Sequence, residues 1–202
     1  MSVDDAQASA KERILSAAIE LIKRDEGELS SREVARHANV NAALINYHFG
    51  DRDGLIQASV DSYYVGVREI LTALVPRLAD DGFANLVESA VRETLTYLRA
   101  NRALARLVLL DFVRHGRMRD QSRATEDPLL SLAVDAFSRQ LSLSEHEVRF
   151  RIKTIILLCG RYVVINDDEL ARVAGTDDPT EAWNRLESHL VDLARQLFLA
   201  RD

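Results

Sequence analysis

Residues 29–60 read LSSREVARHANVNAALINYHFGDRDGLIQASV, and this stretch decides the fold of the N-terminal part of the chain. It opens on Ser30-Ser31-Arg32-Glu33, a capping-box spelling in which the Ser30 hydroxyl accepts from the Glu33 amide while Glu33 reaches back. A short helix is predicted from there to about His37. Ala38-Asn39-Val40 then predicts a tight turn, because asparagine tolerates the left-handed conformation that such turns need.

Helices are predicted on both sides of this turn. A helix from Asn41 to about Phe49 would turn Leu44 and Ile45 inward. Asp51 can cap a long helix from Arg52 towards Val75, which ends near Pro76. Before the stretch, a helix from about Ala8 that Gly27 stops is indicated by apolar residues on one stripe, Ile14, Ala18, Leu21 and Ile22. Two short helices joined by a tight turn and braced by a third make the helix-turn-helix arrangement, whose second helix enters the major groove of DNA.

The rest of the chain also predicts helices. Apolar periodicity indicates them at residues 83–100, 102–115, 128–141, 144–165 and from Pro179 through Phe198, with a polar loop at 166–178. Ser144-Glu145-His146-Glu147 repeats the capping-box spelling, and Pro179 suits the first position of a helix. Residues 155–158 are apolar nearly all round their helix, which predicts burial from several sides. The fold class is therefore all-α, with about nine helices.

Composition narrows the class of protein. The 202 residues carry a formal net charge of −6, and residues 1–60 hold 7 Lys and Arg against 10 Asp and Glu, so any DNA surface must be a local patch. No apolar run approaches a membrane span, and the polar N-terminus is unlike a signal peptide, which predicts a cytoplasmic protein without a membrane partner. Cys159, the single cysteine, excludes an intrachain disulfide and suits an inert apolar filler.

Residues 29–60 resemble the DNA-binding signature of the TetR/AcrR-like family of bacterial transcriptional regulators, and the resemblance covers about residues 10–60. Ser30 matches the hydroxyl that begins the second helix, Tyr47-His48-Phe49 the end of the third, and Arg52 the basic residue after the turn. The resemblance implies a helix-turn-helix DNA-binding domain over residues 1–52. It implies an effector-binding and dimerisation domain over residues 53–202.

The resemblance and the chemistry of the side chains together predict the DNA contacts. Asparagine pairs bidentately with adenine and alanine meets a thymine methyl, whereas hydroxyls, free amides and arginines bind phosphates. The predicted DNA-binding residues are Ser30, Ser31, Arg32, Arg36, Asn41, Ala42, Ala43, Asn46, Tyr47, His48 and Arg52. Arg32 and Arg36 also suit a solvated helix face, His48 suits a packing role, and Val40 and Phe49 suit the core. The chain departs from the family at Asn39 for a turn glycine, Leu44 for threonine and Asn46 for a phosphate-binding tyrosine.

The C-terminal helices predict a partner and a ligand. The helices near 144–165 and 179–200 are too apolar for a lone surface pair, so they are expected to form a twofold four-helix interface in a homodimer; the alternative is a monomeric core. The family implies an unidentified small-molecule effector that releases operator DNA. The residues predicted to line its site are Tyr63, Tyr97, Leu107, Asp111, Arg114, Phe137, Cys159 and Tyr162. Tyr97 and Tyr162 also suit the core, and Asp111 with Arg114 a surface ion pair.

Other function classes find little support in the sequence. It holds no Gly-rich phosphate loop, no metal-spaced histidine and cysteine set and no G-x-S-x-G motif, so we expect no catalytic residues, no metal and no cofactor. The alternative function is a helical ligand-binding or protein-interaction module without specific DNA binding. Whether the regulator represses or activates depends on the position of its operator.

Overall fold

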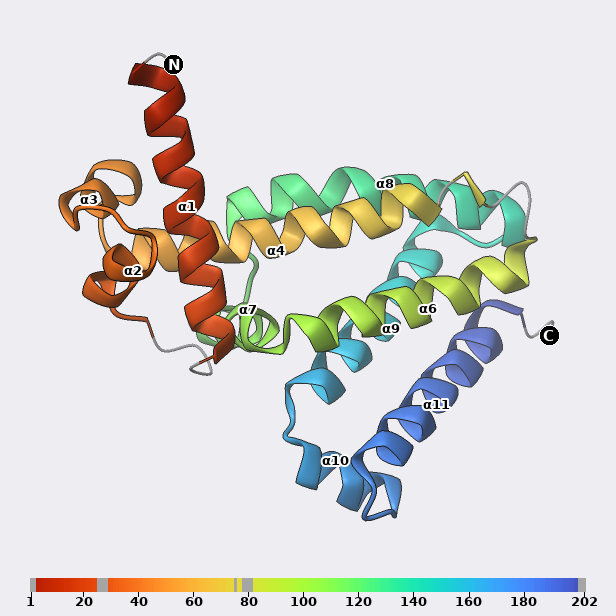
Figure 1. The fold of residues 1–202 in the computed structure, drawn as a ribbon. Coiled ribbons are helices and arrows are strands. Elements are labelled where there is room, and N and C mark those ends of the chain that lie inside the picture. The colour runs from red at the N-terminus through yellow and green to blue at the C-terminus, as the bar shows by residue number, and fades with distance from the viewer. Residues whose placement is uncertain (1–2, 25–28, 75, 78–81, 200–202) are drawn as a thin grey trace. The chain divides into compact units, whose positions relative to one another are not determined.

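The computed structural model describes residues 3–24, 29–74, 76–77 and 82–199 (Figure 1). Within these ranges the chain forms ten helices and no strand, which confirms the all-α class and comes close to the expected nine. The helices are α1 (Val3–Arg24), α2 (Ser31–His37), α3 (Ala43–Phe49), α4 (Arg52–Leu74), α6 (Phe83–Ala100), α7 (Arg102–His115), α8 (Asp120–Leu141), α9 (Glu145–Val164), α10 (Asp167–Ala174) and α11 (Pro179–Leu199). No described helix is both long and apolar enough to cross a membrane.

The chain divides into two compact units. The first comprises Met1–Tyr63 and Asn101–Met118, and the second comprises Tyr64–Ala100 and Arg119–Asp202. In the first unit α1 packs on α2, α3 and α7. The predicted apolar stripe of α1 is confirmed, because Ile14, Ala18, Leu21 and Ile22 are all buried. The predicted end of this helix at Gly27 lies outside the described residues.

The second unit is a helical bundle. Helix α6 packs on α11 and α9, α8 packs on α9, and α10 packs on α11 (Figure 1). Leu130 and Val134 of α8 meet Val148 of α9 in a buried cluster against which Phe137 packs. The Phe137 ring also stands edge-on to those of Phe83, at a centroid distance of 4.8 Å, and Phe198, at 5.3 Å. Apolar side chains from α6, α8, α9 and α11 thus share one core.

Two expectations about the C-terminal helices are wrong. Helix α8 begins at Asp120 instead of Pro128, which lies inside the helix. Residues 120–127 are mostly polar, so no apolar stripe announced their helical conformation. The expected loop over residues 166–178 contains α10, whose buried Leu170 and Ala171 pack it on α11. Eight residues with two buried apolar side chains are too short to give a clear helical period.

The helix starts are confirmed in position but not in chemistry. Ser30 and Ser144 are the N-cap residues of α2 and α9, yet neither side chain makes a capping hydrogen bond. Glu33 instead accepts from Arg24 of α1 at 2.6 Å. A tertiary ion pair therefore replaces the predicted local capping box at α2. Asp51 does cap α4, since its Oδ1 accepts from the Gly54 amide at 2.7 Å.

Candidate nucleic-acid interface

The turn between α2 and α3 has the geometry predicted from Ala38-Asn39-Val40. The Ala38 amide donates to the Val34 carbonyl at 2.8 Å, and the Val40 amide donates to the Ala35 carbonyl at 3.0 Å. Asn39 has a φ of 52°, in the left-handed region that asparagine enters at lower cost than most residues. This turn lets two short helices follow each other with a sharp change of direction, as a helix-turn-helix requires.

Helix α3 has an inner and an outer face. Ile45 is fully buried and Leu44 is half-buried, so both predictions of inward packing hold. Ala42, Ala43, Asn46 and Tyr47 are exposed, and 69% of the Tyr47 surface is open to solvent. A side chain this open is available for contact with a partner molecule. The structure thus brings four of the predicted DNA-contacting residues together on one short helix and its first turn.

Asn41 lies before α3 instead of within it, because the helix begins at Ala43 and not at the expected Asn41. Its side-chain Oδ1 accepts from the Ala43 amide at 2.9 Å, so it stabilises the start of the helix. One acceptor position on Oδ1 is therefore already used, whereas the side-chain amide of exposed Asn41 still has two donors for a base or phosphate. Asn46 differs from Asn41 in lying within the helix, on its exposed face.

The predicted residues of α2 form the second part of the candidate surface. Ser30 is exposed at the N-cap and Ser31 is half-buried in the first turn. Arg32 is exposed, and the Arg36 side chain is 78% exposed with Nη2 3.6 Å from Glu33 Oε1. At this exposure and distance the ion pair holds the Arg36 guanidinium only weakly. Both arginines can therefore turn towards a phosphate.

Arg52 makes a structural hydrogen bond that its position in the sequence motif did not predict. Its Nε donates to the Leu29 carbonyl at 2.6 Å, which fastens the segment before α2 to the start of α4. Its Nη1 lies 3.7 Å from Asp53 Oδ1, and half of the side chain is exposed. The remaining guanidinium N–H groups are available to a phosphate, because arginine carries five donors.

His48 lies half-buried at the end of α3. Its ring contacts Tyr47 at a centroid distance of 4.9 Å and Phe49 at 6.3 Å, both edge-on. Its Nε2 is buried and has no hydrogen-bond partner among the described residues. These ring contacts are those of a packing residue, the second of the two roles considered for it.

Gly54 belongs to this junction and sequence reasoning missed it. A Cβ atom at this position would lie 1.9 Å from the Phe49 carbonyl oxygen, far inside van der Waals contact. Only glycine lets the first turn of α4 approach the end of α3 so closely. The available signal was a glycine in the first turn of a predicted helix, where it lowers helix propensity without an evident reason.

The residues predicted to line an effector site are divided between the two units. Tyr63, Leu107, Asp111 and Arg114 lie in the first, whereas Tyr97, Phe137, Cys159 and Tyr162 lie in the second. Asp111 Oδ1 lies 3.2 Å from His115 Nδ1, within the same helix. Burial raises the pKa of Tyr97, with a smaller contribution from Glu69, and raises the pKa of the Cys159 thiol to about 12. Tyr97 is close to Gly66 of α4, where a Cβ would meet its hydroxyl oxygen at 2.2 Å.

Helix α9 leaves an apolar face uncovered. Ile155 is buried as expected, but Ile156 is 41% exposed, Leu157 61% and Phe150 73%. The prediction that the apolar middle of this helix is buried from several sides is therefore wrong for a single chain. By contrast, α11 buries Trp183, Leu186, Leu190 and Phe198 within its own unit.

Comparison with known proteins adds independent information. Residues 14–59 match the family model described as bacterial regulatory proteins, tetR family. A curated relative, the probable HTH-type transcriptional regulator YttP of Bacillus subtilis (strain 168), is 28% identical over 103 residues, which is 50% of each chain. This chain thus spans about half the length of the curated relative that it matches.

Solved structures share the fold over nearly the whole chain. A TetR variant from Acinetobacter baumannii AYE in complex with minocycline has a TM-score of 0.62 and 16% identity, with 90% of this chain and 92% of that chain covered. A tetR-family transcriptional regulator from Streptomyces coelicolor has a TM-score of 0.64 and 15% identity, covering 98% and 82%. The multidrug binding protein EbrR complexed with imidazole has a TM-score of 0.60 and 19% identity, covering 95% and 96%. At these identities the likeness concerns the fold.

Proposed function

We propose that this chain is a sequence-specific DNA-binding transcriptional regulator, as the match of residues 14–59 to the tetR family of bacterial regulatory proteins supports. The observation that carries the proposal is the outer face of α3, where Ala42, Ala43, Asn46 and Tyr47 are exposed while Ile45 anchors the helix from within. A helix presented in this way after a tight turn fits the major groove. Residues 1–52 then form the DNA-binding part and residues 53–202 the effector-binding and dimerisation part.

Two kinds of contact divide the work on DNA. Asn46, and Asn41 through its side-chain amide, can hydrogen-bond to base edges, and Ala42 and Ala43 can accommodate a thymine methyl. Ser30, Ser31, Arg32, Arg36, Tyr47 and Arg52 are the candidates for phosphates, which fix the register of the protein on the duplex, whereas His48 packs the end of α3. The chain's net charge of −6 makes this local patch of arginines the electrostatic basis of binding.

A homodimer supplies the second recognition helix. Two copies of α3 about 34 Å apart would enter successive major grooves of a near-palindromic operator. The uncovered face of α9 with Phe150, Ile156 and Leu157 supports an interface that includes this helix, because a folded chain rarely leaves such an apolar patch open. The matching copy would bury these three side chains.

An effector completes the proposed cycle. Minocycline and imidazole are bound by two of the proteins that share this fold, which supports a small-molecule ligand in residues 53–202 of this chain. A ligand that binds the non-operator conformation more tightly than the operator conformation releases the DNA, and this is repression with induction. Activation from a differently placed operator uses the same contacts.

Selection of bound sequences from a random duplex pool tests the proposal. We expect an inverted repeat, bound by two chains, whose affinity falls steeply with salt. Asn46→Ala should relax specificity at one position per half-site by about 1–3 kcal/mol. Arg32→Ala should weaken binding to all sequences and reduce the salt slope by about 0.9 for each phosphate that is no longer neutralised.

Arg139→Ala is the matched control, because Arg139 is an exposed arginine of α8 paired with Asp135 in the other unit. Arg52→Ala is a poor test, since it also removes the hydrogen bond to the Leu29 carbonyl. If folded, dimeric protein enriches no sequence from the pool, the proposal is overturned. It would favour a ligand-binding or protein-interaction module instead.

A further inference from the structure

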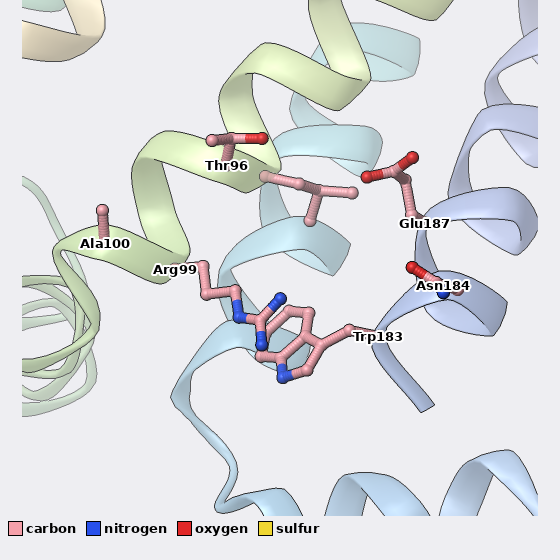
Figure 2. Close-up of a pocket in the computed structure, with 7 residues that line it drawn as sticks. Thr96, Arg99, Ala100, Trp183, Asn184 and Glu187 are labelled. Carbon is pink, nitrogen blue, oxygen red and sulfur yellow. The ribbon is translucent and has the colours of Figure 1, made fainter. Parts of the chain in front are cut away.

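A hollow of about 340 Å³ opens between α6 and α11, both within the second unit. Figure 2 shows its walls, with side chains of α6 on one side and side chains of α11 on the other. It is lined by Leu95, Thr96, Arg99, Ala100, Trp183, Asn184 and Glu187. None of these seven residues belongs to the predicted DNA or effector contacts. The hollow is thus a separate feature, and its volume lies within the usual range for small-molecule sites.

Arg99 is the central cation of this hollow. Its guanidinium carbon lies 4.5 Å from the centroid of the Trp183 ring, so the planar guanidinium of Arg99 on α6 stacks on the indole of α11 (Figure 2). Among the described residues, no carboxylate forms an ion pair with Arg99. The indole fixes one face of the guanidinium and leaves its N–H edges in the plane, where they can bind an anion.

The acidic residue of the hollow is already neutralised. Glu187 is paired with Arg92 of α6, and Arg92 also pairs with Glu88 at 2.9 Å. Arg195 of α11 binds the same Glu88. These two arginines and two glutamates together have no net charge. Arg99 therefore gives the hollow its excess positive charge. Exposed Asn184 adds an amide that can donate to the same anion.

Apolar surface lies next to these donors. Leu95 and Trp183 are almost completely buried, so each presents only a small apolar area to the hollow. Thr96 Oγ1 donates to the Arg92 carbonyl at 2.9 Å, so its hydroxyl proton is already engaged. A ligand here therefore meets the Arg99 guanidinium at one end and a small apolar patch beside it.

We propose that the hollow between α6 and α11 binds a small organic acid, with its carboxylate on Arg99 and Asn184 and a flat apolar body against the exposed parts of Leu95 and Trp183. The planar fork of arginine matches a carboxylate in two parallel hydrogen bonds, which favours this anion over a neutral amide of the same shape. The bound acid joins α6 to α11 and stabilises the packing of these two helices. The site goes beyond the proposed DNA-binding function and does not depend on it.

The fluorescence of Trp183 reports occupancy directly, because it is the single tryptophan of the chain. Benzoate is the probe, benzamide its neutral isostere, and inorganic phosphate a second anion; calorimetry with the same three compounds gives an independent affinity. We expect a saturable benzoate signal. The affinity for benzamide should be lower by roughly 10-fold or more, because benzamide cannot form the charge-assisted bidentate pair. The affinity for phosphate should be lower by a similar factor, because phosphate has no apolar body.

Variants locate the site. Arg99→Ala should lower benzoate affinity by roughly 10-fold or more, and Asn184→Ala by a smaller factor. Arg139→Ala removes an exposed arginine from another surface of the same unit and should leave the affinity unchanged. Circular dichroism of each variant checks that the helices persist. Equal binding of benzoate and benzamide, stronger binding of phosphate, undiminished binding by Arg99→Ala, or no saturable binding would each overturn the proposal.

Discussion

Position 54, where the first turn of α4 approaches the end of α3, admits only glycine, because there is no room for a side chain. A Cβ atom would lie 1.9 Å from a backbone oxygen, which cannot rotate away as a side chain could. Gly54→Ala should therefore destabilise the chain by about 1–3 kcal/mol, the usual cost of forcing an extra methyl into a filled space. Thermal unfolding followed by circular dichroism measures the change.

The control for Gly54→Ala is Thr72→Ala, an exposed position of the same helix, which should leave stability within about 0.5 kcal/mol. Alanine is the better helix former at both positions, so propensity alone predicts stabilisation in each case. A stable Gly54→Ala protein would show that the junction of α3 and α4 can relax to admit a methyl group.

Cys159 should be chemically silent in the folded chain. Burial raises its pKa to about 12, well above the usual value near 8.5, so the nucleophilic thiolate is scarce below that pH. At pH 8 we expect slow alkylation by iodoacetamide in the native protein and rapid alkylation after unfolding in urea. Rapid labelling of the native protein would contradict this and revive a redox or ligand role for the thiol.

The same shift fixes the sign of a pH effect. Because the folded pKa of Cys159 lies above the unfolded pKa, the unfolded chain loses the proton first as the pH rises. The stability that the buried thiol contributes is fully present below about pH 8.5 and is lost as the pH rises towards about 12. Cys159→Ala should make the loss of stability over this window shallower.

At the level of the helices, the N-cap residues Asn166 and Ser30 are expected to have different roles, one in stability and one in DNA binding. The Asn166 side chain accepts from the Glu169 amide at 2.7 Å and caps α10, whereas the Ser30 hydroxyl makes no such bond at α2. Asn166→Ala should cost about 0.5–2 kcal/mol of stability, and Ser30→Ala should cost clearly less. Urea unfolding measures both.

DNA affinity should respond in the opposite order. Ser30→Ala removes a predicted phosphate contact and should weaken binding to the selected operator, while Asn166→Ala should leave binding by the folded fraction unchanged. Equal stability losses in the two variants would contradict the capping geometry. A normal operator affinity for Ser30→Ala would remove this residue from the proposed DNA surface.

At the level of the whole molecule, the uncovered face of α9 predicts the oligomeric state. Leu157, which is 61% exposed in one chain, lies on this face. Leu157→Glu should convert the dimer to monomers and lower operator affinity, because the interface would have to bury an unpaired charge. Sedimentation velocity at several concentrations measures the assembly.

Val113→Glu provides the comparison for Leu157→Glu. Val113 of α7 is also exposed, at 72%, but lies in the other unit and outside the proposed interface. It should leave the dimer intact. A Leu157→Glu protein that stays dimeric would move the interface away from this part of α9.

Local patterns alone were sufficient for several features of this protein. The stripe of α1, the left-handed Asn39, the Asp51 cap and the break at Asn101 between α6 and α7 depend on neighbours a few residues apart, and the structure confirms them. The helix-turn-helix and its exposed residues belong to this class, because helix period, turn conformation and capping are properties of short segments. The DNA contacts stay a prediction that selection from a duplex pool tests.

Interactions between distant segments decided the remaining features. The Arg24–Glu33 pair between α1 and α2 displaced a capping box, and the Leu29 carbonyl engaged Arg52 of α4. The hollow around Arg99 and Trp183 arises where α6 meets α11, 84 positions apart in the chain. No period or motif encodes such a meeting, since it depends on how buried faces pack once the helices exist, and packing is set by the whole core at once.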